Sequence, residues 1–175
     1  MYNNWTVDLS DSVIALESIK YTILPKLIGG KIHTIENQKN EVLMRIDIKS
    51  GIDYIREDEN GLQGIAARVQ WGNDWDTFTI RSERHTGTKT ELDKRLYQIE
   101  NGYFYPAFTL QAYFDNREDN NLLSIAIIKT DVLYDLYKSN RKLFKSRSSD
   151  NKFVFIEWKK IKRHIKSYHS NTTFL

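Results

Sequence analysis

The 175-residue sequence lacks cysteine altogether and has only two prolines. Without cysteine the chain can form no disulfide and can hold no metal through thiolates. It has no apolar run long enough to cross a membrane, and its N-terminus lacks the basic and then apolar pattern of a secretory signal. The four histidines show no zinc-ligand spacing, and no Gly-rich phosphate loop or nucleophile elbow occurs. These absences predict a cytoplasmic protein with no membrane partner.

The composition that remains is that of a folded protein with an uneven charge distribution. Hydrophobic residues make up 40% and aromatic residues 13%, so we expect a single domain over residues 1–175. The net charge of +3 hides a basic tail, because eleven Lys or Arg and two acids follow from Lys138 onward, a net +9. The preceding 137 residues carry a net −6. Such a tail suits a polyanion partner, and it fits a solvated basic helix equally well.

Hydrophobic periodicity predicts an alternation of strands and helices. Residues 139–152 are polar and basic, and we interpret them as a loop. The resulting order predicts an α/β (α+β) fold with a single mixed β-sheet flanked by helices. The helices are expected at 11–27, 90–101, 132–140 and 159–168, and the strands at 31–36, 42–48, 51–55, 65–71, 77–84, 105–115, 122–129 and 153–158.

Two neighbouring strands carry polar side chains in an otherwise apolar setting. Asp53 lies on the strand 51–55, and Arg68 and Gln70 lie two residues apart on the strand 65–71. Because side chains alternate between the faces of a strand, Arg68 and Gln70 must share one face. We expect the Asp53 carboxylate to lie opposite them, in one cleft.

This layout resembles the PD-(D/E)XK nuclease superfamily, also called restriction-endonuclease-like. In that family an Asp ends one strand, and Glu/Asp-x-Lys follows on the next. Here Asp53 matches the Asp, and Arg68-Val69-Gln70 occupies the place of Glu-x-Lys. Some family members have Gln at the position of Gln70, whereas Arg68 departs from the pattern because a cation cannot ligate a divalent metal. The resemblance covers a core of about 11–138 and leaves a basic strand–helix extension at about 153–169.

The resemblance implies a Mg²⁺-dependent endonuclease of restriction, repair or phage type that hydrolyses DNA phosphodiester bonds. Mg²⁺ needs two or more oxygen ligands, and it polarises the phosphate and the attacking water. Asp53 would be one ligand, and Gln70 would orient the water. Glu91 is the first candidate for the second acid and metal ligand, Glu17 is the next, and Asp47 is the third. Each of these three acids has a plainer interpretation, as a residue that stabilises a helix dipole or faces solvent.

Arg68 leaves two other interpretations open. It could bind a phosphate bidentately without any metal, joined by Arg81, Arg84 and Lys89. It could also form a structural salt bridge with Asp53. In the first case the protein would be a catalytically inactive nuclease fold that binds nucleic acid, or a protein partner within a larger assembly. A structural module of a virus or mobile element is a third hypothesis.

The tail supplies further candidate contacts to nucleic acid, which we expect to be DNA. If residues 159–168 form a helix, four of its cations share one face, with Ile161 and Ile165 on the other. Tyr103 and its neighbours are candidates for stacking on bases if they are exposed. The sequence also leaves a homodimer open. The candidate cations of the tail are Lys159, Lys160, Lys162, Arg163 and Lys166.

Overall fold

A computed structural model describes residues 4–35, 40–84, 86–148 and 151–170. Its elements follow the predicted alternation for most of the chain, and they form the expected α+β fold. In chain order they are α1 (Asn4–Lys20), α2 (Leu24–Ile28), β1 (Lys31–Thr34), α3 (Glu41–Ser50), β2 (Tyr54–Asp58), β3 (Gly61–Trp71), β4 (Thr77–Arg84), α4 (Glu91–Glu100), β5 (Phe108–Phe114), β6 (Leu122–Lys129), α5 (Thr130–Ser139), β7 (Lys145–Ser148), β8 (Asn151–Glu157) and β9 (Ile165–Ser170), with short 3-10 turns at Arg141–Leu143, Trp158–Lys160 and Lys162–His164.

The strands form two sheets where we expected one. A six-stranded mixed sheet has the order β1-β2-β3-β5-β6-β9, in which only the β3–β5 pair is parallel. A three-stranded antiparallel sheet has the order β4-β8-β7. The chain turns away after β3 through Gly72 (φ 91°) and Asp76 (φ 45°), so β4 pairs with β8 instead of returning beside β3. This departure opens the space in which the candidate site lies.

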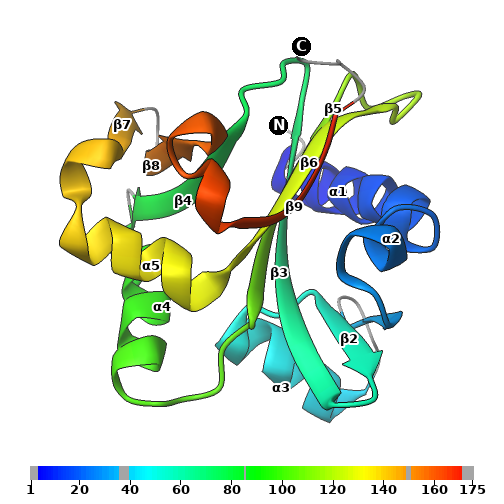
Figure 1. Ribbon diagram of the computed structural model, residues 1–175, viewed down its shortest axis with the longest axis horizontal. Coiled ribbons are helices and arrows are strands. Elements are labelled where there is room, and N and C mark those ends of the chain that lie inside the picture. The colour runs from blue at the N-terminus through cyan, green and yellow to red at the C-terminus, as the bar shows by residue number, and fades with distance from the viewer. Residues whose placement is uncertain (1–3, 36–39, 85, 149–150, 171–175) are drawn as a thin grey trace.

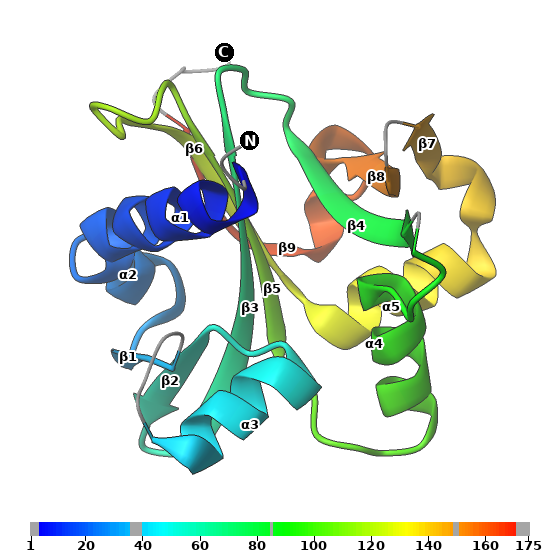
Figure 2. The same cartoon turned by 180° about the vertical axis from the view of Figure 1, so that it is seen from behind.

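Both faces of the six-stranded sheet are covered. Helices cover one face, and two further helices and the small sheet cover the other. Figures 1 and 2 show α1 and α2 on one face and α4, α5, β4 and β8 on the other. The packing agrees, since α1 contacts β3, α5 contacts β6, and α4 contacts both β4 and α5. The protein is therefore layered, with the large sheet in the middle.

Strand alternation divides the core between these two layers. On β6, Ile125 and Ile127 pack with α1, whereas Ala126 and Ile128 pack with α5 and the small sheet. All four are completely buried. A strand that is buried on both faces reads as a near-continuous apolar run, which is why the bounds of β6 match the expected 122–129.

Helix α3 corrects the strand expected at 42–48. Apolar residues at every second position favour a strand, but here most of them are exposed, including Val42 and Ile48. The helix is favoured by a cap: the Asn40 side chain accepts hydrogen bonds from the N–H groups of Val42 at 2.9 Å and Leu43 at 3.3 Å. An ion pair between Glu41 and Arg45, four residues apart at 2.6 Å, adds to it. Local capping thus outweighs the alternation.

The basic helix expected at 159–168 is also wrong. The chain there makes two 3-10 turns and then enters β9, which pairs with the free edge of β6. Ile161 is buried and Ile165 is partly buried, so the two isoleucines anchor the segment as expected, but without a helix. Unpaired backbone groups at the β6 edge gain partners from β9, a gain that an isolated helix would not provide.

Smaller differences concern ends of elements. The first helix begins at Asn4 and ends at Lys20, and Pro25 stands in the first turn of the separate helix α2, where a missing N–H is tolerated. The expected loop at 139–152 contains β7 in its described part. β1 ends at Thr34, and the end of the expected strand at Glu36 lies outside the described residues.

Candidate functional site

Alternate residues of β3 face different layers, as the sequence predicts. Ile65, Ala67 and Val69 pack into the core beneath α1. Arg68 and Gln70 therefore lie on the other face, toward the small sheet, and both line cavities there. This face of β3 is the floor of the candidate site.

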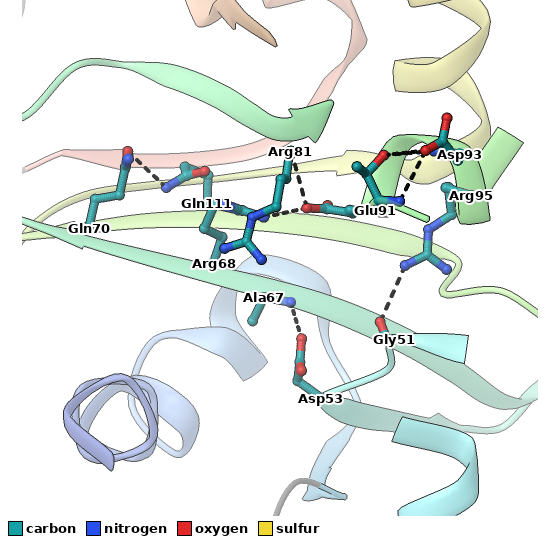
Figure 3. Close-up of polar contacts among 11 residues, drawn as sticks. Gly51, Asp53, Ala67, Arg68, Gln70, Arg81, Glu91, Asp93, Arg95 and Gln111 are labelled. Atoms are coloured by element: carbon teal, nitrogen blue, oxygen red, sulfur yellow. Dashed lines mark hydrogen bonds and ion pairs between the residues drawn. The ribbon is translucent and has the colours of Figure 1, made fainter. Parts of the chain in front are cut away.

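Asp53 lies just before β2, at the point where β3 changes neighbours. β2 pairs with residues 61–65 of β3, and β5 pairs with residues 65–71. The Asp53 carboxylate accepts a hydrogen bond from the Ala67 N–H at 2.5 Å, beyond the last residue of β3 that pairs with β2 (Figure 3). The side chain of Asp53 thus bonds to the backbone of β3 beyond the point where β2 stops pairing with it.

The expected meeting of Asp53 with the polar side chains of β3 occurs in part. Asp53 and Arg68 line one cavity of about 170 Å³, together with Glu91 and Gln111. Gln70 instead lines a neighbouring cavity, and it lies 3.4 Å from the Gln111 amide that donates to it. Asp53 and Arg68 thus line a common cavity, and Gln70 lines the adjacent one.

Glu91 is the first residue of α4, and the local sequence fixes it there. Thr90 caps the helix: its hydroxyl accepts from the Asp93 N–H at 3.3 Å, and the Asp93 carboxylate accepts from the Thr90 N–H at 3.0 Å. The hydrogen bonds that the Thr90 N–H and the Thr90 hydroxyl donate to the Asp93 carboxylate lower its pKa. Glu91 thus lies at the N-terminus of α4, where the helix-dipole interpretation places it, and its side chain also reaches β3 and β4.

Glu91 forms an ion pair with Arg68 (Figure 3). Both side chains are about three-quarters buried, at 25% and 26% exposure. The Arg81 N–H also donates to Glu91, at 3.5 Å. The expected metal ligand and the expected phosphate-binding cation are thus each other's partners.

A cluster of guanidinium groups surrounds this pair. We call Arg68 of β3 with Arg81 and Arg84 of β4 the arginine cluster. Arg68 and Arg81 both stack near the Phe153 ring, 5.6 and 5.5 Å from its centre. Burial and the neighbouring charges of Arg68 and Arg84 lower the pKa of Arg81. Within the described part of the chain, the buried Nε atoms of Arg81 and Arg84 have no hydrogen-bond partner.

Arg95 supports the site from α4 and has no signal in the sequence. It is 5% exposed, and its guanidinium donates to the Ser50 carbonyl at 2.7 Å. It also donates to the Gly51 carbonyl at 3.4 Å (Figure 3). Gly51 has φ 58°, and a Cβ there would lie 3.0 Å from Arg95. Arg95 therefore positions the segment that leads into Asp53. Only the tertiary fold brings these residues together, since 44 positions separate Arg95 from Gly51.

The other candidate acids lie elsewhere or outside the described residues. Glu17 on α1 accepts from the Thr34 hydroxyl at 2.6 Å and pairs with Lys20 at 3.3 Å. It lines a separate cavity, on the α1 side of the protein. Asp47 falls on α3, and its side chain is outside what the structure describes. Glu91 is thus the candidate second acid that shares the cavity with Asp53.

The tail cations do not share one helical face, because the helix is absent. Lys159 pairs with Glu157 at 3.0 Å. Lys166 lies over the Phe108 ring at 4.6 Å, and burial, followed by the charges of Arg56 and Lys129, lowers its pKa. The remaining three are exposed and keep the expected role as open predictions: Lys160, Lys162 and Arg163.

The acidic residues of the site make an incomplete ligand set for a hard metal. Asp53 and Glu91 are the two carboxylates that line the 170 Å³ cavity. Across the described residues, no group of three or more His, Cys, Asp or Glu side chains is placed to hold a metal ion. Two carboxylates can hold Mg²⁺ when water and substrate phosphate complete its shell. One of the two, however, is already neutralised by Arg68.

Comparisons with known proteins add no relative. No protein-family model matches the chain, and neither a curated protein nor a solved structure matches it. None of the described helices combines the length and apolar character that crossing a bilayer requires.

Proposed function

We propose that the protein binds the phosphate backbone of DNA in the cleft between β3 and β4. The observation that carries this proposal is the arginine cluster, in which Arg68 pairs with Glu91, Arg68 and Arg81 lie over the same Phe153 ring, and Arg84 lies close enough to act on Arg81. The excess positive charge is partly buried, where its interaction with an anion is screened less than at the surface. Arginine also presents a planar fork of donors that matches a phosphate.

The mutual repulsion within the cluster supports the same conclusion. Arg81 already has a lowered pKa, because it is buried beside Arg68 and Arg84. A phosphate placed among these groups would relieve the repulsion and supply acceptors for the buried Nε atoms of Arg81 and Arg84. A purely structural ion pair between Arg68 and Glu91 requires neither Arg81 nor Arg84.

The fold is compatible with a restriction-endonuclease-like protein in which the metal centre has changed. Asp53 accepts a hydrogen bond from the Ala67 N–H and lines one cavity with Arg68, the first residue of the segment that takes the place of Glu-x-Lys in the family that the sequence resembles. Arg68 stands in place of the acid. The function proposed first is therefore nucleic-acid binding without cleavage, in a cytoplasmic protein.

Mg²⁺-dependent cleavage of DNA is the second candidate, and one observation favours it. Asp53 and Glu91 line the same cavity. These two residues would hold Mg²⁺, which when bound would polarise the phosphodiester and activate water. Glu91 would first have to part from Arg68, and a phosphate that binds Arg68 provides that competition. Gln70 would act from the adjacent cavity.

The test is DNA binding measured by fluorescence anisotropy over a range of salt concentrations. Each lost phosphate contact should reduce the salt slope by roughly 0.9 on duplex DNA. We expect Arg81→Gln and Arg84→Gln each to weaken binding and flatten the slope. Arg45→Gln is the matched control, since it removes the same charge from exposed helix α3. No binding by the native protein at low salt, or equal effects from all three variants, would contradict the proposal.

Plasmid cleavage in Mg²⁺ or Mn²⁺, compared with EDTA, separates the two candidates. Binding without cleavage in any of these conditions supports the first. Cleavage that Asp53→Ala abolishes, with affinity retained, supports the second.

A further inference from the structure

A second cavity adjoins the site and has a different chemistry. It encloses about 510 Å³ between β3 and the small sheet. Its walls are aromatic and cationic, and none of the described residues that line it is acidic. Ligand pockets typically measure about 300–1,000 Å³, so this one has room for a small organic group. We call it the aromatic pocket and define it by Trp75, Phe153, Phe155, Arg68, Arg147 and Gln70.

The aromatic rings of this pocket offer surfaces on which a flat ligand can stack. Trp75 is 53% exposed, and the Arg147 guanidinium lies 5.7 Å from its ring centre. Phe153 lies beneath Arg68 and Arg81, at 5.6 and 5.5 Å. Flat rings and guanidinium planes are the surfaces on which nucleobases stack, with little dependence on base identity.

Polar groups in the same pocket suit the edge of a base. Gln70 offers an amide donor and acceptor, and Thr77 and Thr79 line the pocket beside it. Side-chain amides pair with base edges in many complexes with nucleic acid. Among the described residues, the Gln70 side chain has one polar contact, a long hydrogen bond of 3.4 Å that the Gln111 amide donates.

The pocket is continuous with the proposed phosphate site. Arg68 and Thr79 line both this pocket and the cavity that holds Asp53 and Glu91. A phosphate bound at Arg68 would therefore leave its own or a neighbouring base at the mouth of the aromatic pocket. A base that is paired and stacked within a duplex cannot enter such a pocket, whereas an unpaired or extruded base can.

We propose that the aromatic pocket binds one unpaired nucleotide, so that the protein acts on single-stranded or locally unpaired DNA. The inference rests on the proposed function and names its substrate class. Phosphate recognition belongs to the arginine cluster, and base recognition belongs to Trp75, Phe153 and Gln70. The phosphate-binding and base-binding parts of the site share Arg68.

The test compares three labelled ligands by fluorescence anisotropy at one salt concentration. They are a short thymidine homopolymer, a strand of the same length built of abasic sites, and a duplex that contains the homopolymer. Stacking on aromatic side chains contributes enough per base that we expect the native protein to bind the homopolymer roughly 5- to 100-fold more tightly than the abasic strand. The duplex should bind more weakly than the homopolymer.

Variants at Trp75 connect this difference to the pocket. Trp75→Ala should remove most of the preference for the homopolymer over the abasic strand, and Trp75→Phe, which retains a ring, should keep most of it. Tyr21→Ala is the matched control, because Tyr21 is an aromatic residue of 73% exposure that lines a different cavity. It should leave the preference unchanged.

The outcomes distinguish this inference from the proposed function. Equal affinity for the homopolymer and the abasic strand, or a preference that survives Trp75→Ala, would overturn the aromatic pocket as a nucleotide site and leave phosphate binding standing. If no strand binds but thymidine monophosphate does, in a manner that depends on Trp75, the pocket is supported and the proposed function is overturned. If neither strands nor monophosphate bind, both are overturned.

Discussion

The two faces of β3 differ in chemistry although they share one strand. On the α1 face, Ile65, Ala67 and Val69 join a continuous apolar core. On the cleft face, Arg68 pairs with Glu91, and both remain about one-quarter exposed. Apolar burial contributes to stability in proportion to area, whereas a buried ion pair is often no more stabilising than apolar residues of the same shape. The charges of the cleft face are thus poorly explained by stability, which favours a role in binding.

The largest effect should come from the apolar face. Leu110 of β5 is completely buried in the core beneath α1. Leu110→Ala should lower the free energy of unfolding by about 3 kcal/mol, because it removes apolar contacts and leaves a cavity. Urea denaturation measures this. A stability loss below about 1 kcal/mol would show that this face is not the main source of stability.

Arg95 should rank second, because it joins the cleft face to the rest of the fold. Arg95→Met keeps the bulk but loses the donors to the Ser50 and Gly51 carbonyls. We expect a loss of about 2 kcal/mol, as for buried hydrogen bonds to a charged group. Weaker DNA binding should accompany it if the segment before Asp53 moves. Full stability in Arg95→Met would contradict the positioning role.

A third prediction concerns pH and the carboxylates at the start of β4. Burial, followed by the nearby Asp74, raises the pKa of Asp76 from 3.8 to about 6. The folded protein therefore holds this proton more tightly than the unfolded chain does, so the stability contributed by protonated Asp76 is present below pH 3.8 and is lost as pH rises through 6.

Asp76→Asn imitates the protonated form and tests this directly. Above pH 6 the variant should melt about 2–4 °C higher than the native protein, an estimate reduced for the partial exposure of the side chain. Near pH 4 the two melting temperatures should converge. A melting difference that does not change with pH would mean that Asp76 titrates normally.

The smallest effect should come from the cap that orients Glu91. Thr90→Ala removes the hydroxyl that accepts from the Asp93 N–H. A loss of about 1 kcal/mol is typical for such caps, and thermal or urea unfolding can detect it. Thr90→Ser retains the hydroxyl and should restore most of the stability. If Thr90→Ser is as unstable as Thr90→Ala, the cap is not the cause.

The sequence predicts the apolar face better than the cleft face, and the reason is physical. Alternation along β3 and the apolar run of β6 depend on local periodicity, which a single chain displays. The strand expected at 42–48 failed because Asn40 and the Glu41–Arg45 pair favour a helix over the same alternating residues. The helix expected at 159–168 failed because the edge of β6, distant in sequence, pairs with that segment.

The candidate site shows the same difference between features that depend on local periodicity and features that depend on the tertiary fold. Strand periodicity predicts that Arg68 and Gln70 share a face, whereas the position of Asp53 opposite them is an added hypothesis; Asp53 and Arg68 line one cavity. The pairing of Arg68 with Glu91 joins residues 23 positions apart on different elements. Arg95 likewise acts across the fold. Such contacts depend on the positions of β4 and α4 in the folded protein, and local sequence patterns do not predict these positions.

The arginine cluster itself is tested most directly by the NMR signals of arginine Nε–H groups during a titration with single-stranded DNA. Arg81→Lys and Arg84→Lys assign the signals. We predict that the Nε–H resonances of Arg81 and Arg84 shift as DNA is added, while that of Arg45 stays in place, because the buried Nε atoms of the cluster gain phosphate acceptors. Shifts confined to Arg163, with Arg81 and Arg84 unchanged, would contradict the account and assign DNA binding to the tail cations instead.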